Sequence, residues 1–145
     1  MIPTALAFGA FAGAILLFLS HVAPSIGGGN FIRDLDEPHF FGRDVSHREA
    51  HFLGALTHLT LSGVFGGLYA YLVQIGVFAD FGIVSILIWG FLTSVFIGGV
   101  VLPIEGHGIF GIKEDHWFPI DLVLTSVVWA VVFWGLMHLW PHLIG

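Results

Sequence analysis

The chain has 145 residues, of which 57% are hydrophobic and only 10% are charged. Soluble domains carry about 25% charged residues, so this composition argues against a soluble domain and favours a protein embedded in lipid. The net charge of −6 comes from 10 acidic and 4 basic residues, too few bases for a nucleic-acid surface, and the lack of cysteine excludes disulfides and thiolate metal sites.

Four apolar segments follow one another along the chain, at about 3–22, 52–73, 82–103 and 119–140. Each has about 20 residues, enough to cross a bilayer as a helix, and none contains Lys or Arg. The first segment has no positive residue before it and is expected to be a retained span rather than a signal peptide.

The sequence therefore predicts an all-α integral membrane protein with a single transmembrane domain over 1–145. Its four helices, at about 3–22, 47–73, 82–103 and 119–140, are expected to form an up-down antiparallel bundle. Four spans place both termini on one side and the connections, at about 23–46 and 104–118, on the other side.

The basic residues predict the orientation. All of them lie in or beside the two connections, namely Arg33, Arg43, Arg48 and Lys113. Because loops rich in Lys and Arg stay in the cytoplasm, both connections are predicted to be cytoplasmic and both termini to be outside. We expect this membrane to be the inner (cytoplasmic) membrane of a prokaryotic cell.

Small residues recur at a spacing of four in the first two spans. Gly9 and Gly13 share one face of the first span, and Gly63 and Gly67 share one face of the second. Small residues at this spacing let two helix backbones approach closely in lipid. We expect them to pack helices within this bundle rather than to form a dedicated contact between copies.

The second helix combines a capping signal with a stripe of histidines. Ser46 and Glu49 have the spacing of a capping box, which gives Glu49 a structural role rather than a metal-binding one. At about 100° per residue, His47, His51 and His58 lie within about 40° of one another around the helix axis. A stripe of imidazoles that enters a membrane span predicts a polar interior for the stripe to face.

Polar residues from all four spans fall at similar depths, in the cytoplasmic half of the membrane. With a rise of about 1.5 Å per residue, His58 lies about 9 Å and Asp121 about 3 Å inside the boundary. An ionisable group inside a span usually faces the bundle interior and marks a functional site. The sequence thus predicts a polar layer of His21, His51, His58 and Asp121, with Glu105 and His47 as weaker candidates.

This layer has the chemistry of a cofactor site. Imidazole suits iron, copper and zinc, so His21, His51 and His58 are candidate ligands of haem, a chlorophyll-type pigment or a transition metal. Asp121 is a further ligand or the acceptor that fixes a histidine tautomer. His21 and His51 suit a six-coordinate haem, whereas His58 would be a single axial ligand. The structural alternative is that His58 forms a hydrogen bond with Thr125 or Ser126 on another helix.

Two short segments resemble parts of known membrane-protein families, and neither carries the prediction. The His47-x3-His51 pair resembles one fragment of the histidine boxes of membrane desaturases and hydroxylases, whose other boxes are absent here. The segment from Trp134 to Trp140 resembles the pigment-binding helix of antenna polypeptides over about one helix.

Proton movement is a third possibility, because histidine titrates near neutral pH. Toward the outer side, only Ser62, Tyr69 and His138 continue the stripe, which argues against a complete path within one copy. No GxSxG, HExxH or paired-aspartate phosphoryl-transfer motif is present, so a stand-alone enzyme is not expected.

We therefore expect a small subunit of a larger membrane assembly, in contact with the lipid bilayer and with other membrane subunits. The alternative is an independent small protein that transports a solute or conducts protons or metal ions.

Overall fold

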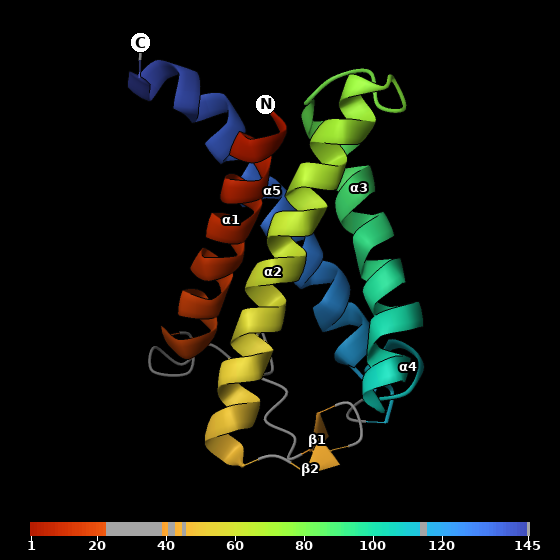
Figure 1. Ribbon diagram of the computed structural model, residues 1–145. Coiled ribbons are helices and arrows are strands. Elements are labelled where there is room, and N and C mark those ends of the chain that lie inside the picture. Colours follow the sequence, from red (N-terminus) through yellow and green to blue (C-terminus); the bar gives the residue numbers. More distant parts are fainter. Residues whose placement is uncertain (23–38, 41–42, 45, 114–115, 145) are drawn as a thin grey trace.

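The computed structural model describes residues 1–22, 39–40, 43–44, 46–113 and 116–144 of this chain (Figure 1). Most of the connection at about 23–46, with Arg33, lies outside the described residues, as does the side chain of His47. The regular secondary structure of the described residues is helical, apart from two strands of two residues each, β1 (His39–Phe40) and β2 (Arg43–Asp44), which pair antiparallel. The prediction of an all-helical protein is confirmed at this level.

Four helices are long and apolar enough to cross a membrane, as the sequence predicts. They are α1 (Ile2–Val22), α2 (His47–Gln74), the third span and α5 (Phe118–Ile144). The third span runs from α3 (Ile83–Phe96) through the π-helical turn η2 (Ile97–Val101) into α4 (Leu102–Glu105). The short 3-10 helix η3 (Ile109–Gly111) precedes α5, whose helix continues beyond the expected end at about residue 140.

The first turn of α2 contains the capping box that the sequence indicates. Ser46 has extended backbone angles, and its hydroxyl oxygen accepts a hydrogen bond of 3.3 Å from the Glu49 backbone amide. The Glu49 carboxylate accepts one of 2.9 Å from the Ser46 amide in return. The two side chains satisfy backbone amides that have no partner within the helix, which is why α2 starts here.

The helices pack as two pairs. α1 lies along α2, α3 lies along α5, and α1 also contacts α5, whereas α2 and α3 touch over a short length only. In Figure 1 both chain termini and the turn between α2 and α3 lie near one end of the helices, which we call the terminal end. The strands β1 and β2, the start of α2 and helix α4 lie near the opposite end, which we call the loop end.

Glycines set the close contact between α1 and α2. A Cβ atom added at Gly9 would collide with the Ser62 carbonyl oxygen. One added at Gly13 would lie 2.6 Å from the Ser62 hydroxyl. On α2, a Cβ at Gly63 would lie 3.2 Å from the Leu6 carbonyl oxygen of α1. Gly67 meets the Leu6 side chain in the same way, at 2.6 Å. The four glycines singled out in the sequence therefore lie at this helix contact.

Aromatic rings fill the core toward the terminal end. Trp129 and Phe133 stack in parallel with ring centroids 5.1 Å apart, and Tyr69 meets Phe133 edge to face. The indole of Trp129 donates a hydrogen bond of 3.1 Å to the Gly9 carbonyl of α1. The indole of Trp89 donates one of 3.2 Å to the Phe65 carbonyl of α2. These bonds let the rings be buried without an unsatisfied indole N–H.

Candidate functional site

Two histidines from different helices meet at the loop end. His21 belongs to the last turn of α1 and His51 to the second turn of α2. Their ring centroids are 5.4 Å apart and their planes are inclined by 86°, an edge-to-face contact. Both side chains are exposed. The structure thus brings together the two residues that the sequence predicts as facing ligands.

The tautomer of His21 follows from its own helix. Its Nδ1 lies 2.8 Å from the Leu17 carbonyl oxygen and 3.3 Å from the Ser20 hydroxyl. Because a carbonyl oxygen only accepts hydrogen bonds, the neutral ring carries its proton on Nδ1 in this contact. The lone pair of the neutral imidazole is then on Nε2.

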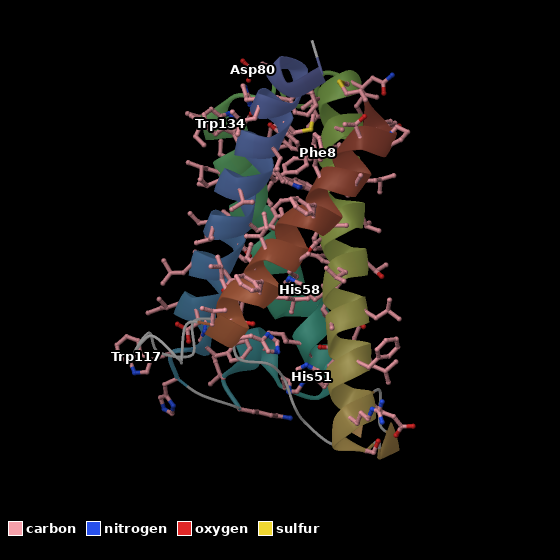
Figure 2. All side chains as sticks on the ribbon, turned by 90° about the vertical axis from the view of Figure 1, so that its left-hand side faces the viewer. Phe8, His51, His58, Asp80, Trp117 and Trp134 are labelled. Atoms are coloured by element: carbon pink, nitrogen blue, oxygen red, sulfur yellow. The ribbon has the colours of Figure 1, made fainter. Side chains whose placement is uncertain are left out.

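His58 has a different environment, in the middle of the contact between α1 and α2 (Figure 2). Its Nε2 donates a hydrogen bond to the Gly13 carbonyl oxygen at 3.3 Å. The missing side chain of Gly13 provides the space, since a Cβ there would approach both the Ser62 hydroxyl and the His58 ring. His58 therefore joins two helices through a backbone carbonyl.

The carboxylates do not join these histidines in one metal site. Asp121 is half-buried in the first turn of α5, where the helix dipole favours a negative charge, and Glu105 is half-buried at the end of α4. Among the described residues, no group of three or more His, Asp or Glu side chains is arranged to hold a metal ion. The two residues of the predicted layer whose rings contact each other are His21 and His51.

The buried hydroxyl groups mostly bond to their own helices. Among the described residues, the buried polar side chains are Ser20, Ser62, Thr93, Ser94, His107 and Ser126. Four of their hydroxyls donate to carbonyl oxygens three or four residues earlier, at distances between 2.7 and 2.9 Å. Such bonds satisfy a hydroxyl without linking two helices.

His107 is buried, although it is not among the candidate site residues predicted from the sequence. The turn after α4 uses positive φ angles at Gly106 (99°) and Gly108 (78°), which glycine adopts without strain. The His107 amide donates a hydrogen bond of 2.9 Å to the Leu102 carbonyl oxygen, and the His107 side chain is only 5% exposed. The signal that could have found it is the glycine directly after a helix end, which closes a tight turn.

The same loop covers the π-helical turn of the third span. A Cβ atom at Gly98 would collide with the Phe110 ring, and one at Gly111 would collide with the Phe118 ring. Phe110 has a φ of 54°, an uncommon backbone conformation for a bulky residue. The absence of a side chain at Gly98 in η2 therefore leaves space for the Phe110 ring of the loop.

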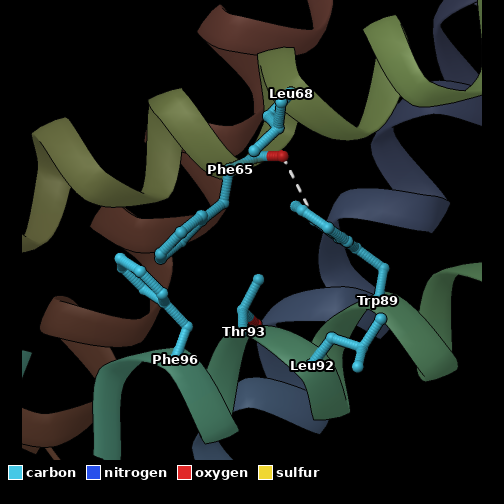
Figure 3. Close-up of a pocket in the computed structure, with 6 residues that line it drawn as sticks. All are labelled: Phe65, Leu68, Trp89, Leu92, Thr93 and Phe96. Carbon is cyan, nitrogen blue, oxygen red and sulfur yellow. Dashed lines mark hydrogen bonds between the residues drawn. The ribbon is translucent and has the colours of Figure 1, made fainter. Parts of the chain in front are cut away.

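An apolar groove separates α2 from α3 (Figure 3). It has a volume of about 220 Å³ and is lined by Phe65, Leu68, Trp89, Leu92, Thr93 and Phe96. The Thr93 hydroxyl is bonded to the Gly90 carbonyl of its own helix, and the Trp89 indole is bonded to Phe65. Leu92 and Phe96 are each 47% exposed, so the groove opens on the outside of the protein.

Tyr69 is buried away from the histidines. Its hydroxyl lies 2.7 Å from the Ser85 hydroxyl and donates a hydrogen bond of 3.1 Å to the Asp80 carbonyl oxygen. Asp80 and Ser85 lie in or beside the turn at the terminal end. Between Tyr69 and Ser62, the ring of Phe65 packs edge to face against Trp89 and Phe96. In the described part of the chain, the histidine stripe therefore meets an aromatic region and not a further polar step.

Comparison of the chain with protein-family models gave no match, and comparisons with curated proteins and with solved structures gave none either.

Proposed function

We propose that this chain is a four-span membrane protein that works as a small subunit of a larger membrane assembly. Its single domain over 1–145 is an up-down bundle with both termini outside and the connections in the cytoplasm of a prokaryotic cell. The groove between α2 and α3 is the observation that carries this proposal, and it is the surface that receives a helix of another subunit.

The lining of the groove supports a protein partner. Helices associate in lipid chiefly by van der Waals packing, and an unfilled space between two helices loses those contacts. Rigid aromatic side chains, which are enriched in the cores of protein interfaces, form much of the groove through Phe65, Trp89 and Phe96. A partner helix that inserts an apolar side chain there completes the packing that α2 and α3 leave open.

Transport by a single copy has less support. A path for protons or ions needs polar groups on both sides of the membrane, and the histidine stripe is followed by the aromatic contacts of Phe65 and Tyr69. The hydroxyls that line the spans donate to carbonyls of their own helices. Transport by a single copy is therefore the alternative hypothesis to the subunit proposal.

The cofactor hypothesis narrows to the histidine pair. A six-coordinate haem would have to enter between the His21 and His51 rings, which are in edge-to-face contact. Axial ligation by His58 through Nε2, of haem or pigment, would have to replace its hydrogen bond to the Gly13 carbonyl. Both changes need rearrangement, whereas a single metal ion beside the His21 and His51 rings leaves the hydrogen bond of His58 in place.

Native mass measurement of the protein extracted from its own membrane tests the subunit proposal. The wild-type chain is expected in a complex heavier than one copy. Leu92→Trp fills the groove and should release the chain from this complex. Val84→Trp is the matched control, because Val84 lies on the same helix, is 68% exposed and does not line the groove. A wild-type chain that runs as a lone monomer would overturn the proposal.

The orientation has its own test. Since the chain contains no cysteine, single-cysteine variants report topology without background. A membrane-impermeant maleimide is expected to label Val77→Cys, in the terminal-end turn, in intact cells. It should label Ile112→Cys, at the loop end, only after permeabilisation. The reverse pattern would place the termini in the cytoplasm.

A further inference from the structure

We propose that His21 and His51 bind a divalent transition metal ion, which clamps the end of α1 to the start of α2. The site would take Cu²⁺, Ni²⁺ or Zn²⁺, the ions that imidazole nitrogens prefer. The proposal rests on the histidine pair considered under the proposed function and not on the subunit role. A negative result with the groove variants would therefore leave the metal site untouched, and a negative metal titration would leave the subunit proposal untouched.

The distance between the rings fits one bridging ion. Metal–nitrogen bonds of about 2.0–2.1 Å require the two coordinating nitrogens to come within about 4 Å of each other. With ring centroids 5.4 Å apart, the exposed His51 side chain can bring a nitrogen to that separation by rotation, while the Leu17 carbonyl holds the His21 ring. The helix backbones do not have to move, because α1 and α2 are already packed closely by Gly9 and Gly13.

The hydrogen bond of His21 prepares the ring for coordination. Histidines that bind metals usually donate their other ring N–H to a carboxylate or a backbone carbonyl, which fixes the tautomer and the ring orientation. His21 does this with Nδ1 and the Leu17 carbonyl at 2.8 Å. Its Nε2 is therefore the coordinating atom, and it belongs to the ring that contacts His51.

Two protein ligands define the character of the site. Among the described residues, no third His, Asp or Glu joins the pair in a metal-binding group, so the proposal is made for two protein ligands. Such a site is open and reversible, and its affinity should follow the general order in which Cu²⁺ exceeds both Ni²⁺ and Zn²⁺. An ion bound there links the two helices that flank the connection at about 23–46 and stabilises the folded protein against unfolding.

Binding to the purified protein tests this directly. The protein is placed in nanodiscs without a polyhistidine tag and titrated with Cu²⁺, Ni²⁺ and Zn²⁺ by calorimetry. Wild type should bind one ion per chain, and its melting temperature should rise by about 4 °C or more at a hundredfold excess over Kd. His21→Ala and His51→Ala should each weaken binding at least about tenfold. Electron paramagnetic resonance of bound Cu²⁺ should show two nitrogen ligands in wild type and one in either variant.

His138 offers a matched control. It is exposed and its Nδ1 bonds to the Trp134 carbonyl at 2.9 Å, as His21 bonds to Leu17, but its ring lies against Trp134 and not against a second histidine. His138→Ala should bind as wild type does. Equal affinity in wild type and His21→Ala, or an equal loss in His138→Ala, would overturn the site. His51→Gln, which keeps the bulk of the side chain, should fold as wild type and still lose the second nitrogen signal.

Discussion

Different interactions hold the helices together at the two ends of this protein. Toward the terminal end, rings from three helices interlock, and two indoles donate hydrogen bonds to backbone carbonyls of other helices. Toward the loop end, the buried hydroxyls bond within their own helices, and histidines make the polar contacts between helices. Figure 2 shows Trp134 and Phe8 toward the first end and His51 and Trp117 toward the second.

This difference suggests where stability and where function reside. In lipid, burial of apolar surface gives little driving force between helices, so shape complementarity and hydrogen bonds across helices decide the fold. The terminal end has both. At the loop end, the buried hydroxyls and the His21 ring form hydrogen bonds within their own helices. We expect substitutions to separate along the same division.

The largest effect is expected from Phe133→Ala in the aromatic core. Phe133 is fully buried and contacts both Trp129 and Tyr69. Loss of a buried Phe costs about 3–5 kcal/mol in water-soluble proteins. In a membrane the transfer term is smaller, because the unfolded side chain also meets apolar surroundings, so we expect about 2–3 kcal/mol from the cavity. Equilibrium unfolding in mixed micelles measures it.

Val131→Ala provides the control on the same helix, since Val131 is 45% exposed and outside this cluster. It should change the free energy of unfolding by less than about 0.5 kcal/mol. Equal losses in the two variants would contradict the conclusion that the aromatic core, and not helix α5 in general, stabilises the terminal end.

A smaller effect is expected from Gly66→Ala. The new methyl group would collide with the Ala5 carbonyl oxygen and lie 3.0 Å from the Gly9 Cα, both backbone atoms that cannot rotate away. Overpacking of this kind costs about 1–3 kcal/mol, and we expect about 2 kcal/mol by the same unfolding measurement.

Gly54→Ala is the control in the same helix, because a Cβ at Gly54 meets nothing within 4 Å. It should be neutral or stabilise the protein by up to about 1 kcal/mol, since alanine is the better helix former. A loss in Gly54→Ala as large as in Gly66→Ala would mean that the collision with the α1 backbone is not responsible for the loss.

Hydropathy and residue spacing were sufficient to predict where the helices lie in the sequence, but not which residues each helix contacts. The apolar segments, the start of α2 at Ser46 and the small residues at the contact with α1 could all be located in the sequence, because each depends on local composition or periodicity. The His21–His51 contact was also expected, since both residues lie at the same predicted depth. Depth along a helix axis follows from counting residues.

The tilt of each helix relative to its neighbours could not be predicted from the sequence. The groove exists because α2 and α3 diverge, and divergence depends on packing across the whole bundle and not on any one segment. For the same reason the hydrogen bond between His58 and the Gly13 carbonyl was not predicted from the sequence. A backbone acceptor exposed by a missing side chain leaves no signal beyond a glycine.

The smallest expected effect belongs to His58, and it distinguishes a structural histidine from a ligand. His58→Leu keeps the bulk of the side chain and removes the hydrogen bond to Gly13, which is worth about 1 kcal/mol or less between membrane helices. The absorption spectrum of the purified protein between the near ultraviolet and the red should be the same in wild type and variant. Loss of a Soret or chlorophyll-type band in the variant would instead identify His58 as an axial ligand. In that case the loop end would be organised around a cofactor, and the hydrogen bond to Gly13 would belong to the empty form of the site.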